Sequence, residues 1–296
     1  MTAAPLRPLG VGEIVDRTIT LFRGNLRLLV GIGAPLYLGL AILGTVPYFV
    51  FGIDVDSSQL TRTEIGPALN RMLAALPVLA TLAAVGGAVG IVQSLALTQA
   101  AFARYLGRDV TIGDALRSAL RAAVPVFFAG LLGVLLILVV PLAGVALGLA
   151  GQAAGVLLVS FGGFSLAIIG SFLAVYLSFG LSLVGPVVLL EGLAPAAAVR
   201  RSFALISGHR WRALGLSVIL LVIQLALGAL LGILLVPLFL SEPAVQVVGQ
   251  QTINFIVGVL WSPIQWAAIT IFYVDLRVRK EAFDLQLASE ALPRGS

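Results

Sequence analysis

The sequence contains no cysteine and only one histidine, His209. Without cysteine, the chain cannot form a disulfide, a thiolate metal site or a cysteine nucleophile. A single histidine also excludes a metal site built from several histidines of one chain. We therefore expect no metal and no other cofactor. Charge is scarce as well, because only 10% of the 296 residues are charged, whereas a soluble domain carries about 25%.

Apolar residues are in excess: they make up 60% of the chain and give it a mean hydropathy of +1.11. A soluble fold of this length would have to hide more apolar surface than one core can hold. The apolar runs are continuous, whereas the strands of a membrane barrel alternate in polarity over about ten residues. The composition therefore predicts an all-α integral membrane protein, since helices satisfy their own backbone groups in lipid.

Long uncharged runs predict about six transmembrane helices. Four of these crossings are expected at residues 28–53, 72–103, 213–241 and 243–274. Residues 122–190 contain no charge, and their length fits two further crossings joined by a tight turn. We expect this turn at Gly151 and Gln152, with Gly162 and Gly163 as the competing position.

The distribution of basic residues predicts the orientation. Of the 18 Arg and Lys residues, all but Arg62 and Arg71 fall in loops that the crossings assign to one side. The positive-inside rule then places this basic side and both chain termini in the cytoplasm. We therefore expect a multipass protein of the cell membrane, of the bacterial inner-membrane type. The net charge of +5 is explained by these loops and does not imply a nucleic-acid partner.

Three similar basic segments precede the odd-numbered crossings. Each contains an arginine followed by threonine or serine, at Arg17, Arg117 and Arg201. They predict three cytoplasmic amphipathic helices that lie in the membrane interface, with arginine toward the phosphates. Two roles stay open for these helices: recognition of lipid headgroups, or simply bracing the helix pairs that follow them. Bracing is the simpler role.

The three segments also indicate an internal repeat within a single membrane domain, residues 1–290. Each repeat unit would be an amphipathic helix followed by a helix pair. The units are expected at about residues 9–103, 110–190 and 194–274, with a cytoplasmic tail at 275–296. The last five residues of the tail resemble a protease-cleavage remnant and carry no weight here.

Two groups of side chains are candidates for a functional site. Arginines of the basic side are the candidates for lipid headgroups: Arg17, Arg117, Arg200, Arg201, Arg212, Arg277 and Arg279. Polar residues inside the crossings are the candidates for a polar cavity: Gln93, Gln99, Asn254 and Gln265. Interhelical hydrogen bonds, each worth about 1 kcal/mol, are the commoner use of such residues.

Other features of the crossings are less specific. Glu191, at the inner end of the fourth crossing, is expected to form an ion pair with Arg200 or Arg201. Gly228 and Gly232 have the small-xxx-small spacing that allows two helices to approach closely. No ionisable residue falls in the middle of a crossing, which disfavours a proton-coupled transporter.

Three stretches resemble a bacterial multipass family. The first is Pro-Val-Val-Leu-Leu-Glu-Gly-Leu-Ala-Pro at 186–195, continuing to Trp211-Arg212. The second is the tail at 273–285, and the third is the start from Arg7 to Thr18. The family is the one labelled glycerophosphoryl diester phosphodiesterase membrane-domain proteins. The resemblance implies the membrane part alone, because the esterase of the fused members lies in a separate soluble domain that this chain has no room for.

We do not expect an enzyme, because no acid–base or nucleophile set is present. The leading hypothesis is a polytopic membrane protein that organises lipids or partner proteins through its Arg-rich cytoplasmic face. Its expected partners are anionic lipid headgroups, a membrane protein or a second copy of the chain, and not nucleic acid. The alternative is a transporter or channel for a small neutral or amphipathic solute, which would pass through the polar cavity.

Overall fold

The computed structural model describes residues 7–51, 65–239 and 241–286, in which all regular secondary structure is α-helical. The helices are α1 (Val11–Gly24), α2 (Leu26–Phe51), α3 (Ile65–Tyr105), α4 (Ile112–Ala153), α5 (Leu157–Leu181), α6 (Val184–Glu191), α7 (Pro195–Ile206), α8 (Arg210–Leu234), α9 (Val236–Phe239) and α10 (Pro243–Glu281). Six segments of these residues are helical, long and apolar enough to cross a membrane. The predicted all-α multipass membrane protein is therefore confirmed.

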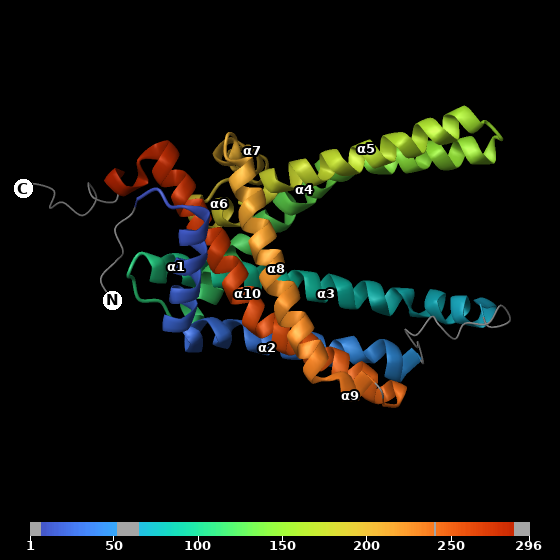
Figure 1. The fold of residues 1–296 in the computed structure, drawn as a ribbon, viewed down its shortest axis with the longest axis horizontal. Helices are drawn as coiled ribbons and strands as arrows, with labels where there is room; N and C mark the ends of the chain where they lie inside the picture. The colour runs from blue at the N-terminus through green and yellow to red at the C-terminus, as the bar shows by residue number, and fades with distance from the viewer. Residues whose placement is uncertain (1–6, 52–64, 240, 287–296) are drawn as a thin grey trace, which may run out of the picture.

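The long helices spread outward from one shared end of the molecule, which we call the basal end (Figure 1). The short helices α1, α6 and α7 lie there, together with the α3–α4 turn and the C-terminal part of α10. α4 and α5 leave the basal end as a separate hairpin, while α2, α3, α8 and α10 extend in other directions. The first and last described helices thus meet at the same end, as an even number of crossings requires.

Local sequence signals explain most helix ends. The side chain of Thr111 accepts a hydrogen bond from the Asp114 N–H at 3.2 Å, which begins α4. α6 is followed by Gly192 and α7 by Ser207 and Gly208, and both glycines have positive φ, which glycine adopts without strain. α1 and α7 are separate amphipathic helices, but the segment around Arg117 is not separate, because α4 continues from it straight into the crossing.

The turn in the long uncharged stretch lies at 154–156, where Gly155 has a φ of +70°. It comes three residues after the expected position, and the competing pair Gly162 and Gly163 lies inside α5. The crossing that follows is broken between α5 and α6, just before Pro186. Proline explains this break, because it donates no backbone hydrogen bond and clashes with the preceding helical turn.

Glycine allows α4 and α5 to pack backbone against backbone. Gly144, Gly148 and Gly151 on α4 face Ser160 and Gly163 on α5, and a Cβ atom added at Gly163 would lie only 2.6 Å from the Gly148 Cα. By contrast, a Cβ atom at Gly228 or Gly232 would meet nothing within 4 Å in the described chain. The small-xxx-small spacing on α8 therefore marks no helix contact within this part of the protein.

The packed core is confined to the basal halves of the helices. Its largest fully buried side chains include Leu9, Ile14, Leu97, Leu205 and Tyr273. α10 is the central helix and contacts α1, α2, α3 and α8. Large apolar side chains of the α4–α5 hairpin are exposed instead. Such a surface is stable when hydrocarbon surrounds it, so the bundle is held together at its base and faces lipid elsewhere.

Candidate functional site

A buried carboxylate fastens the start of the chain to the basal end. The side chain of Asp275 on α10 is 0% exposed. It pairs with Arg212 on α8 at 3.1 Å and with Arg279 one turn later at 3.0 Å, and it accepts a hydrogen bond from the Leu9 N–H at 2.6 Å. Both arginines also donate to the Leu9 carbonyl oxygen, Arg279 at 2.7 Å. We call these four residues the Leu9 clamp.

The Leu9 clamp corrects the expected role of two arginines. Arg212 and Arg279 were candidates for lipid headgroups, yet both turn inward to Asp275. The physical reason is that a buried carboxylate needs positive partners and hydrogen-bond donors, and these two side chains supply them. The clamp joins α8 and α10 to the residues just before α1, so it positions α1 across the base.

A second ionic cluster joins α6, α7 and α10. Arg201 Nε lies 2.9 Å from Glu191 Oε2, and Arg201 also pairs with Glu281. The Tyr273 hydroxyl donates to Glu191 Oε1 at 2.8 Å, and Arg277 pairs with Glu281 at 3.1 Å. Of the two arginines expected as partners of Glu191, Arg201 therefore makes the ion pair. We call these five residues the basal network.

The basal network also takes two arginines away from the lipid. Arg201 and Arg277 are both half-buried, and the Arg277 guanidinium lies 4.1 Å from the centre of the Phe283 ring. The carboxylates of Glu281 and then Glu191 hold the pKa of the Arg201 guanidinium above its ordinary value, against the effect of burial. Neither arginine is free to bind a headgroup, because each already has an internal carboxylate.

The other candidate arginines remain at the surface to different degrees. Arg17 is half-buried and donates to the Tyr105 hydroxyl at 2.8 Å. The Arg117 side chain is 70% exposed and lies 3.8 Å from Asp114. Further arginines that sequence reasoning did not single out are exposed as well. In the part of the chain that the structure describes, five exposed arginines pair with no carboxylate: Arg23, Arg27, Arg108, Arg121 and Arg200.

One of these arginines borders a pocket of about 400 Å³ between α3, α4 and α6. Arg121 and Ser118 line it from α4, and Gln99 lines it from α3. We call it the basal pocket. It offers a guanidinium, a hydroxyl and an amide next to one another, a set that suits the oxygens of a phosphate group.

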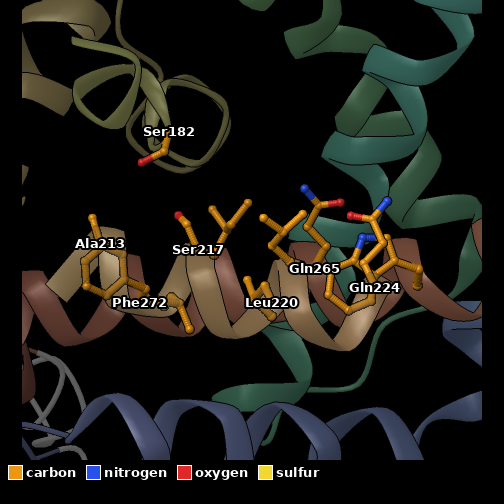
Figure 2. A pocket seen from close by; sticks show the side chains of 11 residues that line it. Ser182, Ala213, Ser217, Leu220, Gln224, Gln265 and Phe272 are labelled. Carbon is orange, nitrogen blue, oxygen red and sulfur yellow. The ribbon is translucent and has the colours of Figure 1, made fainter. Parts of the chain in front are cut away.

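A longer groove runs between α8 and α10, and Figure 2 shows part of it. It consists of two cavities of about 340 and 840 Å³ that share Leu221, Gln224, Trp261 and Gln265. The amide groups of Gln224 and Gln265 project to the same side, and Ser217 lies across the cavity from Ser182 (Figure 2). We call the two cavities together the α8–α10 groove.

The four residues expected to line one polar cavity lie in three different places. Asn254 and Gln265 line the α8–α10 groove, whereas Gln99 lines the basal pocket. Gln93 is buried and donates to the Ser262 hydroxyl at 3.2 Å, which is an interhelical hydrogen bond between α3 and α10. The expectation of one shared cavity is therefore wrong for the described residues. The cause is angular for the two residues on α3: Gln93 and Gln99 are six positions apart, so they point to different sides of the helix.

Sequence reasoning missed the residues that define the α8–α10 groove most clearly. Gln224 carries a signal, because it is the one amide in the long apolar run of α8. Trp261 carries none, since a tryptophan in a crossing is usually a packing or interface residue. Only the structure shows that its indole Nε1 is buried and has no hydrogen-bond partner.

The described residues contain no candidate metal site. Nowhere among them do three His, Cys, Asp or Glu side chains lie close enough together to hold an ion. Three acidic side chains of the base, Glu191, Asp275 and Glu281, are engaged with the arginines of the Leu9 clamp and the basal network. Among known proteins, no family model, no curated protein and no solved structure matches this chain.

Proposed function

We propose that this protein is a non-enzymatic membrane protein whose basal end binds anionic lipid headgroups. The observation that supports the proposal is the set of five exposed, unpaired arginines at the base. The other described basal arginines either pair with carboxylates or, like Arg17 and Arg210, contact a tyrosine. The five are therefore surplus positive charge that internal packing does not use. The resemblance to glycerophosphoryl diester phosphodiesterase membrane-domain proteins stays a prediction and assigns no activity.

The neighbourhood of these arginines suits a membrane interface. Trp211, at the start of α8, is 84% exposed, and tryptophan is enriched where hydrocarbon meets headgroups. Exposed apolar side chains such as Leu26 and Leu120 lie close in sequence to Arg27 and Arg121. Near an anionic leaflet each arginine contributes about 1 kcal/mol of attraction. The basal pocket adds one site where a phosphate oxygen would meet Arg121, Ser118 and Gln99 together.

The proposal includes an orientation, with the basal end in the cytoplasm. Because the chain lacks cysteine, one introduced thiol reports one position. Thr20→Cys places it on the exposed side of α1, and Ala154→Cys places it at the tip of the α4–α5 hairpin. In intact bacterial cells, a membrane-impermeant maleimide is expected to label position 154 and to label position 20 only after the membrane is opened. The reverse pattern would overturn the orientation.

Headgroup binding is tested by comparing two double variants with the same change in net charge. Arg121→Gln with Arg200→Gln removes two unpaired basal arginines, whereas Arg62→Gln with Arg71→Gln removes the two arginines that the sequence assigns to the opposite side. The basal variant is expected to lose about 2 kcal/mol of affinity for phosphatidylglycerol, or about thirtyfold. The control variant is expected to bind like the unaltered protein.

The measurement is native mass spectrometry of protein purified in detergent and supplied with equal amounts of phosphatidylglycerol and phosphatidylcholine. We expect a preference for phosphatidylglycerol that weakens as salt is added, since exposed charges are screened. Equal retention of the two lipids by the unaltered protein would contradict the proposal. An equal loss in both double variants would also contradict it, because the effect would then follow net charge and not the base.

The alternative hypothesis, a transporter or channel, has no continuous pathway to support it in the described residues. It depended on one pathway lined by Gln93, Gln99, Asn254 and Gln265, and the structure separates these residues.

A further inference from the structure

We propose that the α8–α10 groove binds a neutral lipid, whose polar group presents a carbonyl oxygen to the indole N–H of Trp261. This site is distinct from the headgroup site of the base, and the inference does not depend on it. Three observations support it: an unpaired buried donor, two amides beside that donor, and walls that are otherwise uncharged and mostly apolar.

The unpaired donor is the strongest of these observations. Trp261 is 5% exposed and lines both cavities of the groove, and its Nε1 atom has no hydrogen-bond partner. A donor buried in an apolar environment without a partner costs free energy, so native proteins rarely keep one. An indole N–H can only donate, and the missing partner must therefore be an acceptor.

The amides of Gln224 and Gln265 give the site its second polar contact. They project to the same side of the groove (Figure 2), and neither forms a hydrogen bond within the part of the chain that the structure describes. Both residues lie near the middle of long apolar helices, where lipid tails offer no partner. A ligand carbonyl oxygen placed between the amides and Trp261 would accept from the indole N–H and from one amide N–H.

The rest of the groove determines the ligand's charge and shape. None of the described residues that line either cavity is Arg, Lys, Asp or Glu, so a charged headgroup would be buried without a counter-charge. Leu216, Leu220 and Phe272 form the apolar walls of the smaller cavity. Gly228 and Gly232 leave the wall of the larger cavity without side chains, which gives room for a hydrocarbon tail.

α8 also gives a lipid a direct route into the groove. Val218 and Val222 on this helix are exposed outside the groove, so its outer surface faces the bilayer, while the exposed Leu221 and Leu225 line the groove. A neutral lipid with a carbonyl group has two plausible sources in a membrane. One is the ring carbonyl of an isoprenoid quinone, and the other is an ester carbonyl of diacylglycerol. Both have the chemistry that Trp261 and the two glutamines require.

The test uses the full chain in detergent micelles and three probes: a short-tailed menaquinone, dioleoylglycerol and dioleoyl phosphatidylglycerol. Native mass spectrometry measures which of them remains bound. Trp261→Phe removes the N–H but keeps an aromatic ring, and Trp266→Phe is the matched control on the same helix, outside the groove. Trp261→Phe is expected to weaken binding of a neutral probe up to about tenfold, the factor that corresponds to one net hydrogen bond. Trp266→Phe should leave binding unchanged.

Binding of the quinone alone, or of the diacylglycerol alone, supports the proposal and identifies the source of the carbonyl. Binding of neither probe would overturn it, as would unchanged binding to the Trp261→Phe variant. Gln224→Leu provides an independent check, because it also removes a polar contact and should weaken binding. Lipid-free thermal unfolding of each variant shows whether the fold is intact. The double variant at Arg121 and Arg200 should still bind the neutral probe, which separates this site from the headgroup site.

Discussion

Replacing Asp275 by asparagine is expected to lower the free energy of unfolding by about 3 kcal/mol, because removing one member of a buried ion pair leaves the others uncompensated. Asparagine keeps an acceptor for the Leu9 N–H but loses the negative charge that Arg212 and Arg279 share. These two guanidiniums, which both donate to the Leu9 carbonyl oxygen, would then lack a counter-charge. Unfolding of the protein in detergent with increasing dodecyl sulfate measures the change.

The loss of stability in Asp275→Asn should be concentrated in the residues around Leu9, which the Leu9 clamp holds. The Leu9 N–H is bonded to a buried carboxylate, so its exchange with solvent deuterium should be slow in the unaltered protein and fast in Asp275→Asn. Asp16→Asn is the matched control, because Asp16 is exposed on α1 and forms no ion pair in the described chain. If the peptide that contains Leu9 exchanges equally in both variants, the clamp does not hold the start of the chain.

The clamp matters for the proposed function because it fixes where α1 lies. α1 ends next to Arg23, and α2 begins next to Arg27, so both unpaired arginines are presented by this part of the base. A released α1 would move Arg23, whereas Arg27 lies on α2, which packs against α10 and α3. We therefore expect Asp275→Asn to weaken phosphatidylglycerol binding as well, even though Asp275 itself is buried and negatively charged.

The positions of the crossings could be predicted because the bilayer imposes a simple rule on length and charge. A span needs about 20 apolar residues, and charges accumulate at its ends, so the sequence alone located six of them. The turn between α4 and α5 was placed within three residues for the same reason. The break before Pro186 also had a local signal, but proline inside a crossing often produces only a kink.

The partners of the arginines could not be predicted, because pairing depends on which helix faces come together. Arg212 and Asp275 lie on different helices, and nothing in the sequence indicates that they meet. A partial signal existed in the spacing of Asp275 and Arg279, since residues four apart share a helix face. This spacing alone does not indicate a buried pair, because charges near the end of a crossing usually face solvent.

The spacing of glycines predicts a helix contact only when the position of the α4–α5 turn is known. With many glycines in the spans, small-xxx-small matches arise from composition, and Gly228 with Gly232 was such a match. The glycines at 144, 148 and 151 and the residues at 160 and 163 form facing rows only if the chain reverses at 154–156. Their role therefore follows from tertiary structure and not from spacing alone.

Gly163→Val is expected to separate α4 from α5 and to lower the free energy of unfolding by about 3 kcal/mol, the upper part of the range for overpacked sites. Its Cβ would fall 2.6 Å from the Gly148 Cα, so the clash is with backbone, and no side-chain rotation can relieve it. Gly162→Val is the matched control, because a Cβ atom at Gly162 meets nothing within 4 Å.

The two neighbouring substitutions should have opposite signs. In a helix, valine is favoured over glycine by a few tenths of a kcal/mol, so Gly162→Val should be neutral or slightly stabilising. Spin labels on cysteines introduced at the exposed residues Leu149 and Phe161 measure the distance between α4 and α5 directly. We expect this distance to increase in Gly163→Val and to stay unchanged in Gly162→Val. If both variants keep the distance and the unfolding midpoint of the unaltered protein, close glycine packing does not hold the hairpin together.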